Sequence, residues 1–496
     1  MGVVAKQASR AGIAVGFGIV LGAVNTIYVL PRAFEGAEAQ WGLIRVLTAW
    51  GTILGQLTSF GMPSAILRFL PKYSLDERPT LLTMMLLIPV ALLTLAGLVL
   101  LIWGKDLMPL LDGGGNGLLV SHLGLFFVMT VLISGVIFTR AMVNSLLKSS
   151  VAAGVEEMWL KGTYLLLAVL LLNDMLAFET FLKLYVGTYA VGVAVIASQA
   201  WKSGMRLGWK RPEWHKWREI MGFGFYSLLS MSAVVIATNL DYVMVGYYLG
   251  LEAVPLYTMG FFIGQVVAMP VRSTAMIFNG LTADKVAKSD PSTLSPLLKE
   301  SARTQLLMSV AVMAGIWAGF QPFEQILPPA YRDLEWVFLA IGLQRVVLAS
   351  TGVTNNILGF SQHYKLVLPI NIGLLVVTVF SNHLFMKVMG WGLAGAAFAT
   401  MLTAVWNNGW RTLVLYRKFR IHPFSGSWLI IAGLALGCAW AFHWPAGWLG
   451  NPFVEAVLQG GLATGTIVAT SILLGLVPEV EKVVVEKLPW WPRLRR

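Results

Sequence analysis

The sequence contains few charged residues and a single cysteine. Only 12% of its 496 residues are Asp, Glu, Lys or Arg, whereas a typical soluble protein has about 25%. Hydrophobic residues make up 57% and the mean hydropathy is +0.73. This composition excludes a soluble enzyme, a disordered chain and a nucleic-acid-binding protein. The lone Cys438 excludes an intramolecular disulfide.

Sequence motifs for cofactor chemistry are also absent. No GxxxxGK[ST] segment is present, which excludes ATP hydrolysis through a P-loop. The six histidines are scattered, without HExxH or a Cys/His cluster, so no metal or other cofactor is predicted. The net charge of +12 is best explained by cationic cytoplasmic loops.

What the sequence does contain is a series of long apolar segments. A helix needs about 20 mostly apolar residues to cross a bilayer core of about 30 Å. This criterion predicts an all-α polytopic membrane protein with about 14 transmembrane helices. The predicted spans are 10–31, 42–67, 80–103, 120–147, 153–172, 178–200, 219–248, 252–282, 303–321, 334–358, 365–386, 391–416, 427–443 and 453–477.

The basic residues predict how these spans are oriented. With a cytoplasmic N-terminus, 26 of the 36 Lys and Arg residues fall on the cytoplasmic side and 5 on the outer side, while the other 5 lie within spans. Cytoplasmic loops are enriched in Lys and Arg, so both termini are expected in the cytoplasm.

A shift of 214 residues aligns two parts of the chain without a gap. Asn25-x-x-Tyr28-Val29 matches Asn239-x-x-Tyr242-Val243, and Gly36-x-Glu38-Ala39 matches Gly250-x-Glu252-Ala253. The matches predict two six-helix bundles related by a parallel pseudo-two-fold repeat, which is a transporter architecture. The predicted domains are a bundle at 1–200, a basic cytoplasmic linker at 201–218, a bundle at 219–420, and a terminal helix pair with a basic tail at 421–496.

Polar residues form stripes on the second helix of each predicted repeat. Such residues are costly in a bilayer and usually face a wet cavity. Helical spacing places two sets on one face each, and we expect them to line a central cleft. The sets are Arg45, Thr48, Thr52, Gln56 and Ser59, and Thr258, Gln265, Arg272 and Asn279.

Further polar residues are predicted to line the same cleft. They are Asp241 with Ser227, Ser230 and Thr238; Arg140 with Asn144 and Lys148; the pair Glu157 and Lys161; and Arg345 beside Gln344. Each group has an alternative interpretation. Arg45 could reach the outer face by snorkelling, Asn144 and Lys148 could meet lipid headgroups, and Glu157–Lys161 could be a structural pair. Asp241 is either a coupling-ion or proton site, or the counter-charge of Arg272.

The interior charges sum to a cationic cleft, which suits an anionic substrate, since Arg is the preferred ligand of phosphate oxygens. The candidate substrate-binding residues are Arg45, Arg140, Gln265, Arg272, Gln344 and Arg345, with Asp241 as the candidate ion-coupling residue.

Three segments carry a family resemblance. Residues 6–47 (KQASRAGIAVGFGIVLGAVNTIYVLPRAFEGAEAQWGLIRVL), 59–74 (SFGMPSAILRFLPKYS) and 239–270 resemble Wzx-type polysaccharide flippases of the multidrug/oligosaccharidyl-lipid/polysaccharide (MOP) superfamily. The resemblance implies a non-enzymatic flippase of the bacterial inner membrane. It would move a polyprenyl-diphosphate-linked oligosaccharide to the outer leaflet, among membrane lipids. It also implies H⁺ or Na⁺ as candidate coupling ions, and polysaccharide polymerase and glycosyltransferases as candidate partners.

Other functions stay open at this point. A cation-coupled multidrug exporter would have an acidic aromatic pocket, and such exporters usually have twelve spans. A lipid II flippase also has fourteen, but its arginine-rich first-span motif is not evident here. A membrane-embedded glycosyltransferase or polymerase would be expected to carry charged residues in a sizeable outer loop, and the outer loops here are short. A structural scaffold explains neither the repeat nor the stripes.

Overall fold

The structure is a computed structural model that describes residues 3–112, 117–209, 214–287, 291–332, 334–445 and 447–478. Within these ranges the chain is helical and contains no strand. The chain divides into two compact units, Met1–Thr258 and Met259–Arg496, here called unit 1 and unit 2. The predicted division into four segments by residue number remains a prediction.

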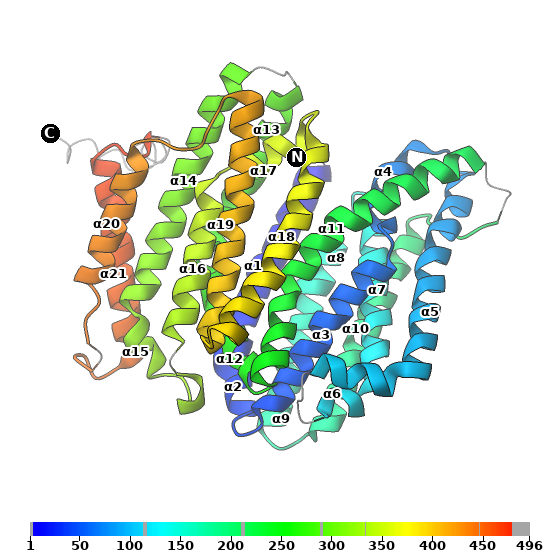
Figure 1. Cartoon of the computed structure of the whole chain (residues 1–496), viewed down its shortest axis with the longest axis horizontal. Helices are drawn as coiled ribbons and strands as arrows, with labels where there is room; N and C mark the ends of the chain where they lie inside the picture. The colour runs from blue at the N-terminus through cyan, green and yellow to red at the C-terminus, as the bar shows by residue number, and fades with distance from the viewer. Residues whose placement is uncertain are drawn as a thin grey trace. The chain divides into compact units, whose positions relative to one another are not determined.

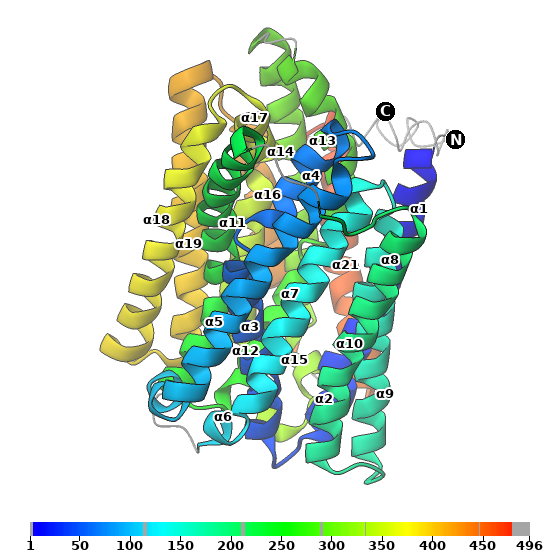
Figure 2. The same cartoon turned by 90° about the vertical axis from the view of Figure 1, so that its right-hand side faces the viewer.

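Helices make up unit 1 almost entirely, as Figure 1 and Figure 2 show in blue to green. They are α1 (Val3–Ala23), the π-helix η1 (Val24–Val29), α2 (Leu30–Ala33), α3 (Glu38–Thr58), α4 (Met62–Phe69), η2 (Leu70–Lys72), α5 (Arg78–Asp112), α6 (Leu118–Ser121), α7 (Leu123–Ser145), α8 (Ser149–Ala153), the π-helix η3 (Gly154–Trp159), α9 (Leu160–Leu172), α10 (Phe178–Lys202) and α11 (Trp214–Leu249).

Helix α12 (Ala253–Val266) crosses the unit boundary, and the remaining helices belong to unit 2. They are α13 (Met269–Ala287), α14 (Pro291–Ala318), α15 (Phe320–Glu324), η4 (Pro329–Tyr331), α16 (Glu335–Ser350), α17 (Thr354–Phe360), η5 (Tyr364–Leu366), α18 (Val367–Asn382), the π-helix η6 (His383–Val388), α19 (Gly392–Phe419), α20 (Ser427–Ala441) and α21 (Pro452–Leu473).

Each predicted span coincides with one helix or with a broken helix. Among the described residues, seven helices are long and apolar enough to cross a membrane alone, or eight when the bent pair α16–α17 is one span. Large apolar side chains such as Leu101 on α5 and Trp440 on α20 are more than four-fifths exposed, as lipid-facing residues are. The chain is therefore a multi-pass membrane protein, and the number of fourteen spans remains a prediction.

The predicted second and eighth spans are broken rather than continuous. Helix α3 ends at Thr58. Gly61 has a φ of 68°, at which a right-handed helix cannot continue, and α4 then begins with Met62-Pro63. The second break separates α12 from α13, which begins with Met269-Pro270. Proline lacks an N–H and clashes with the carbonyl four residues earlier, so it explains why both helices restart at a Met-Pro pair. The expectations of one helix over 42–67 and of one helix over 252–282 were both wrong.

The turns that precede α3 and α12 have the same local conformation. Gly36 and Gly250 both adopt positive φ values, 77° and 90°, which glycine reaches without strain. The carboxylate two residues later folds back in each turn: Glu38 accepts a hydrogen bond from the Gly36 N–H at 3.0 Å, and the Glu252 carboxylate lies against Gly250. The residues that match in sequence here therefore also match in backbone conformation.

Close backbone contacts hold α3 against the turn that follows α11, and the turn between α3 and α4 against α11 itself. A Cβ atom on Gly42 would lie 1.9 Å from the Leu251 carbonyl oxygen, and one on Gly61 would lie 2.1 Å from that of Gly224. Only glycine permits these approaches. A buried apolar cluster that includes Ile66, Phe69 and Ile220 then fills the space between α4, α5, α7 and α11.

Candidate functional site

Aromatic side chains surround Arg45 inside unit 1. Its guanidinium carbon lies 4.6 Å from the centroid of the Tyr242 ring on α11. Tyr164 of α9 and Tyr185 of α10 also interact electrostatically with this guanidinium. Arg45 is partly buried, and its Nε has no hydrogen-bond partner among the described residues. The group is therefore positioned by the Tyr242 ring face and by a side-chain hydrogen bond with Tyr242, and by no carboxylate ion pair among the described residues.

A row of hydroxyl groups follows from Arg45 along α3 and α10. The Thr48 hydroxyl lies 3.2 Å from that of Tyr185, which lies 3.2 Å from that of Tyr189. The Tyr164 and Tyr185 rings are 4.8 Å apart, centroid to centroid. Tyr185 is buried, and its ring also packs against those of Phe181 and Tyr189, so these side chains form an aromatic cluster with a row of hydroxyl groups.

Asp241 is buried in unit 1 with an exposed fraction of 3%. Its Oδ2 accepts a hydrogen bond of 3.2 Å from the Tyr257 hydroxyl, and the Tyr257 ring packs edge-on against Tyr242. The structure thus brings Asp241 to the aromatic groups that surround Arg45. A buried carboxylate at this position is suited to bind a proton or a cation, since either one offsets the cost of burying a negative charge.

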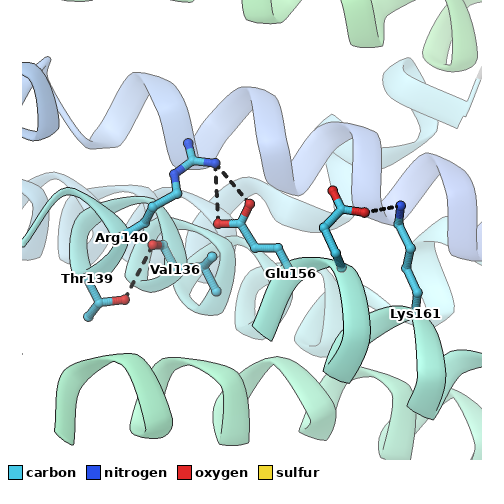
Figure 3. Close-up of polar contacts among 6 residues, drawn as sticks. Val136, Thr139, Arg140, Glu156 and Lys161 are labelled. Atoms are coloured by element: carbon cyan, nitrogen blue, oxygen red, sulfur yellow. Dashed lines mark hydrogen bonds and ion pairs between the residues drawn. The ribbon is translucent and has the colours of Figure 1, made fainter. Parts of the chain in front are cut away.

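Two ion pairs lie next to each other on the α7–η3–α9 side of unit 1 (Figure 3). Arg140 Nη1 lies 3.3 Å from Oε1 and 3.2 Å from Oε2 of Glu156, and Lys161 Nζ lies 2.5 Å from Oε2 of Glu157. Lys161 also donates to the Gly18 carbonyl oxygen of α1 at 3.3 Å. Both cations therefore have carboxylate partners.

Glu156 is a partner that the sequence did not predict, and it changes the charge of the interior. The sum that predicted a cationic cleft counted Arg140 and Lys161, each of which Glu156 or Glu157 neutralises. The adjacent pair Glu156-Glu157 before an apolar run was the available signal. The predicted face of Arg140, Asn144 and Lys148 is also shorter than expected, because α7 ends at Ser145 and Lys148 donates to the Ser203 hydroxyl.

The other candidates lie in unit 2. Arg272, near the start of α13, donates to Gln265 Oε1 of α12 at 3.1 Å, across the helix break, and its side chain is exposed. Arg345 on α16 lies with its guanidinium carbon 5.5 Å from the Phe261 ring centroid, beside Gln344. The structure brings Gln265 and Arg272 together, and it pairs Arg345 with an aromatic ring as it does Arg45.

A further buried arginine was not predicted as a site residue. Arg411 on α19 is 7% exposed, and it donates to Asn371 Oδ1 at 2.9 Å and to Asn407 Oδ1 at 3.1 Å. The predicted orientation counted Arg411 among the 26 cytoplasmic Lys and Arg residues, together with the basic residues at 417–420. The signal for an internal position was the pair of asparagines: Asn407, four residues earlier on α19, and Asn371, on the preceding span.

Two apolar cavities flank α20 in unit 2. One of about 550 Å³ lies between α14, α16 and α20, and its walls include Trp317, Leu343, Leu436 and Trp440. Another, of about 600 Å³, lies between α20 and α21 beside Gly433 and Gly437. Their apolar lining suits a hydrocarbon chain. Within the described residues, no group of three His, Cys, Asp or Glu side chains is placed to hold a metal ion.

Comparison with known proteins agrees with this fold. The family model described as "Polysaccharide biosynthesis protein" matches residues 13–278, more than half of the chain. No curated protein sequence matches the chain.

Several solved structures share the fold at low sequence identity. A lipid II flippase MurJ in an inward closed conformation superposes with a TM-score of 0.72 at 14% identity, covering 93% of this chain and 98% of that one. An inward-facing multidrug resistance MATE family transporter of the MOP superfamily gives 0.60 at 15%, covering 82% and 94%. A MOP superfamily transporter from Pyrococcus furiosus gives 0.55 at 15%, covering 84% and 97%. The chain therefore belongs to the polysaccharide biosynthesis protein family and has the fold of the MOP-superfamily flippases and exporters, as the sequence predicted.

Proposed function

We propose that this protein is a flippase for a polyprenyl-diphosphate-linked oligosaccharide, which it moves from the cytoplasmic to the outer leaflet of a bacterial inner membrane by alternating access. Arg45 is the observation that carries the proposal. Its guanidinium carbon lies 4.6 Å from the Tyr242 ring centroid, and among the described residues it forms no ion pair with a carboxylate. An arginine positioned by rings rather than by a carboxylate is available for a phosphate oxygen.

The aromatic cluster of unit 1 supports a glycan as the rest of the headgroup. Tyr164, Tyr185 and Tyr189 pack against one another next to Arg45, and the hydroxyl groups of Thr48, Tyr185 and Tyr189 follow one another. We propose that Arg45 binds the diphosphate and that the tyrosines bind the sugars. Gln265 with Arg272, and Gln344 with Arg345, are the corresponding proposed ligands in unit 2.

The apolar cavities beside α20 are the proposed site of the polyprenyl tail. Most of their lining residues are apolar, including Leu343 and Leu436 in one cavity and Leu434 and Phe442 in the other, and an isoprenoid chain needs no polar partner. Helices α20 and α21 correspond to the predicted terminal pair at 421–496.

Outward movement of the headgroup requires no ATP. A transmembrane potential is worth about 2.3 kcal/mol per charge per 100 mV, and a diphosphate diester carries about two negative charges. Export from a cell that is negative inside would gain roughly 4–5 kcal/mol per 100 mV, unless a cation crosses with the substrate. Asp241 is the proposed site of such a cation.

The test is a deletion strain complemented with variants of the full chain, in which lipid-linked oligosaccharide is quantified on each face of the membrane with a glycan-reactive probe. Arg45→Ala should trap precursor on the cytoplasmic face at wild-type protein level, and Arg45→Lys should restore little, because Lys lacks the planar fork. Arg32→Ala is the matched control, since Arg32 lies 3.9 Å from the Tyr28 ring, the repeat equivalent of Tyr242.

The result also separates the alternatives. Normal export with Arg45→Ala and Arg345→Ala would overturn the assigned ligands. Trapped peptidoglycan precursor would identify a lipid II flippase, and normal glycan export with a changed drug sensitivity would identify a multidrug exporter, for which the buried Asp241 would be the key acid.

A further inference from the structure

His122 connects two helices at one end of unit 1. It lies between α6 and the first residue of α7, and it is 8% exposed. Its Nε2 lies 3.1 Å from Oε1 of Glu179, which belongs to the first turn of α10. Among the described residues, this is the only ion pair that involves a histidine. In the predicted topology, this end of α7 and α10 faces outward.

Both ring nitrogens of His122 face an oxygen that only accepts hydrogen bonds. Nδ1 lies 2.7 Å from the Leu118 carbonyl oxygen, and Nε2 faces the Glu179 carboxylate. A neutral imidazole has one N–H and can form only one of these hydrogen bonds, whereas an imidazolium donates in both directions. The Ser121 hydroxyl lies 3.0 Å from Nδ1, but it donates to the same Leu118 oxygen at 2.9 Å. The geometry therefore fits the protonated ring.

The position of Glu179 favours a negative charge opposite this ring. Its side chain is 61% exposed, so water solvates the carboxylate. It also lies in the first turn of α10, where the helix dipole stabilises an anion. The proton shared by the two groups therefore belongs on the ring of His122.

Other charged residues lie on the helices that pack against α6 and α7. Among those whose side chains the structure describes, Glu179 alone forms an ion pair with His122. The charge of the ring therefore depends mainly on this one contact. The other charged residues toward this end are Glu38 of α3, Lys105, Asp106 and Asp112 of α5, and Lys183 of α10.

Aromatic rings join His122 to the helix that carries Arg45. The His122 ring packs edge-on against Phe178 at 6.5 Å, and Phe178 packs edge-on against Phe34 at 6.3 Å, between centroids. Phe34 in turn stacks on Trp41 at 6.4 Å, and both are fully buried. Trp41 precedes Arg45 by four residues on α3. Since buried rings pack without free space, the start of α10 and this part of α3 are mechanically linked.

We propose that His122 is a proton-binding site, and that its imidazolium holds the start of α10 against the junction of α6 and α7. With the ring protonated, both hydrogen bonds form. When the ring loses its proton, one of them is lost and α10 is held less firmly. The stabilisation is thus present at low pH and declines as pH rises through the range in which histidine titrates, about pH 6.5. The site is separate from Asp241 and from the proposed substrate ligands.

The first experiment is solid-state NMR of the full chain, with ¹⁵N-labelled histidine, reconstituted in lipid. The nitrogen shifts distinguish an imidazolium from each neutral tautomer, and comparison with His122→Gln assigns the signal. At about pH 6.5, Glu179→Ala should lower the ratio of charged to neutral His122 about threefold, the effect of one partly exposed ion pair. Glu77→Ala is the matched control, since it breaks an ion pair at the opposite end of α5 and should leave the ratio unchanged.

The second experiment measures whether this proton stabilises the helices. Between about pH 5.5 and pH 8, the thermal unfolding midpoint of the wild type should fall more than that of His122→Gln, which cannot bind the proton. His443→Gln is the matched control and should keep the wild-type dependence. Nδ1 of His443 lies 3.0 Å from the Trp317 carbonyl oxygen, a contact that a neutral ring satisfies.

Each outcome decides the proposal. A neutral His122 ring throughout this pH range, or an unchanged ratio in Glu179→Ala, overturns the proton site. Equal changes of the midpoint in the wild type and in His122→Gln overturn its role in holding α10. A lower ratio in Glu179→Ala together with a weaker pH dependence in His122→Gln supports both. None of these measurements depends on transport, so failure here is distinguishable from failure of the proposed flippase function.

Discussion

Arg45 and Tyr242 lie on different helices, α3 and α11, with the guanidinium carbon 4.6 Å from the ring centroid. The two residues are 197 positions apart in the sequence. The Tyr242 ring face thus holds the Arg45 guanidinium. From its sequence position alone, Arg45 could instead have reached the outer face by snorkelling. Contact with Tyr242 favours an internal role for Arg45.

This contact predicts a difference between two substitutions of Tyr242. Tyr242→Leu removes the ring and should weaken precursor binding about fivefold, equivalent to about 1 kcal/mol of cation–π energy. Tyr242→Phe keeps the ring and loses only the side-chain hydrogen bond to Arg45, so it should lose less affinity than Tyr242→Leu. The measurement is the affinity of the purified variants for a fluorescent lipid-linked oligosaccharide. Equal losses in both variants would show that the hydroxyl group, and not the ring face, is what matters.

The ion pair of Arg140 and Glu156 predicts non-additive substitutions. Arg140→Ala leaves Glu156 without its partner and should lower the thermal unfolding midpoint, whereas the double variant Arg140→Ala/Glu156→Ala should recover most of the loss. Midpoints in detergent and export by the complemented strain are measured together. If both variants keep the wild-type midpoint and both abolish export, Arg140 binds substrate and is not merely a structural partner.

The sequence predicted the helices and their order because apolar length is a strong, local signal. The sequence match at Gly36 and Gly250 coincides with a turn of similar conformation, since a glycine with positive φ and a glutamate two residues later occur at both places. The breaks after Thr58 and Val266 were missed although Met62-Pro63 and Met269-Pro270 mark both, because hydropathy alone was used to extend the spans.

The site was predicted less completely than the fold. Arg45 and Asp241 were found as polar residues in apolar helices, but the tyrosines around them look like ordinary lipid-facing or core residues in the sequence. The partner of Arg140 depends on packing between α7 and η3, which periodicity within one helix does not reveal. Arg411 was missed for the same reason, since Asn371 lies on another helix.

Gly42 allows the backbone before α12 to approach α3, which predicts a steric effect. Gly42→Ala places a Cβ 1.9 Å from the Leu251 carbonyl oxygen, so the two segments must separate, at a cost of about 1–3 kcal/mol. The midpoint of thermal unfolding should fall. Gly187→Ala on α10 is the control, because no atom lies within 4 Å of the position that its new methyl group would take and alanine favours a helix. A midpoint unchanged in both variants would contradict the close approach.

The loop before α5 predicts a pH dependence. Lys216 Nζ lies 2.7 Å from Glu77 Oε1, and the hydrogen bond from Lys216, followed by those from Ser74, lowers the pKa of Glu77 below its usual 4.5. A carboxylate with a lowered pKa in the folded state contributes stability above the unfolded pKa and loses it as pH falls through the folded one. Acidification below about pH 4.5 should therefore destabilise the wild type more than Glu77→Gln, measured as the shift of the unfolding midpoint between pH 7 and pH 3. A shift of equal size in both would remove Glu77 as a contributor.

The cavity between α14, α16 and α20 predicts a substitution that discriminates by the length of the lipid tail. Leu436 lines this cavity on α20 and is 75% exposed, so Leu436→Trp can fill part of the space without disturbing the helix core. Leu429→Trp on the same helix is the matched control, since Leu429 is 81% exposed and does not line the cavity. If the polyprenyl tail occupies the cavity, Leu436→Trp should reduce translocation of a long-chain substrate in proteoliposomes and spare an analogue with a short prenyl chain. Leu429→Trp should affect neither. A bulky side chain in an occupied groove competes directly with its ligand. Equal translocation of the long-chain substrate by the two variants would therefore show that the tail lies in the surrounding lipid and not in this cavity.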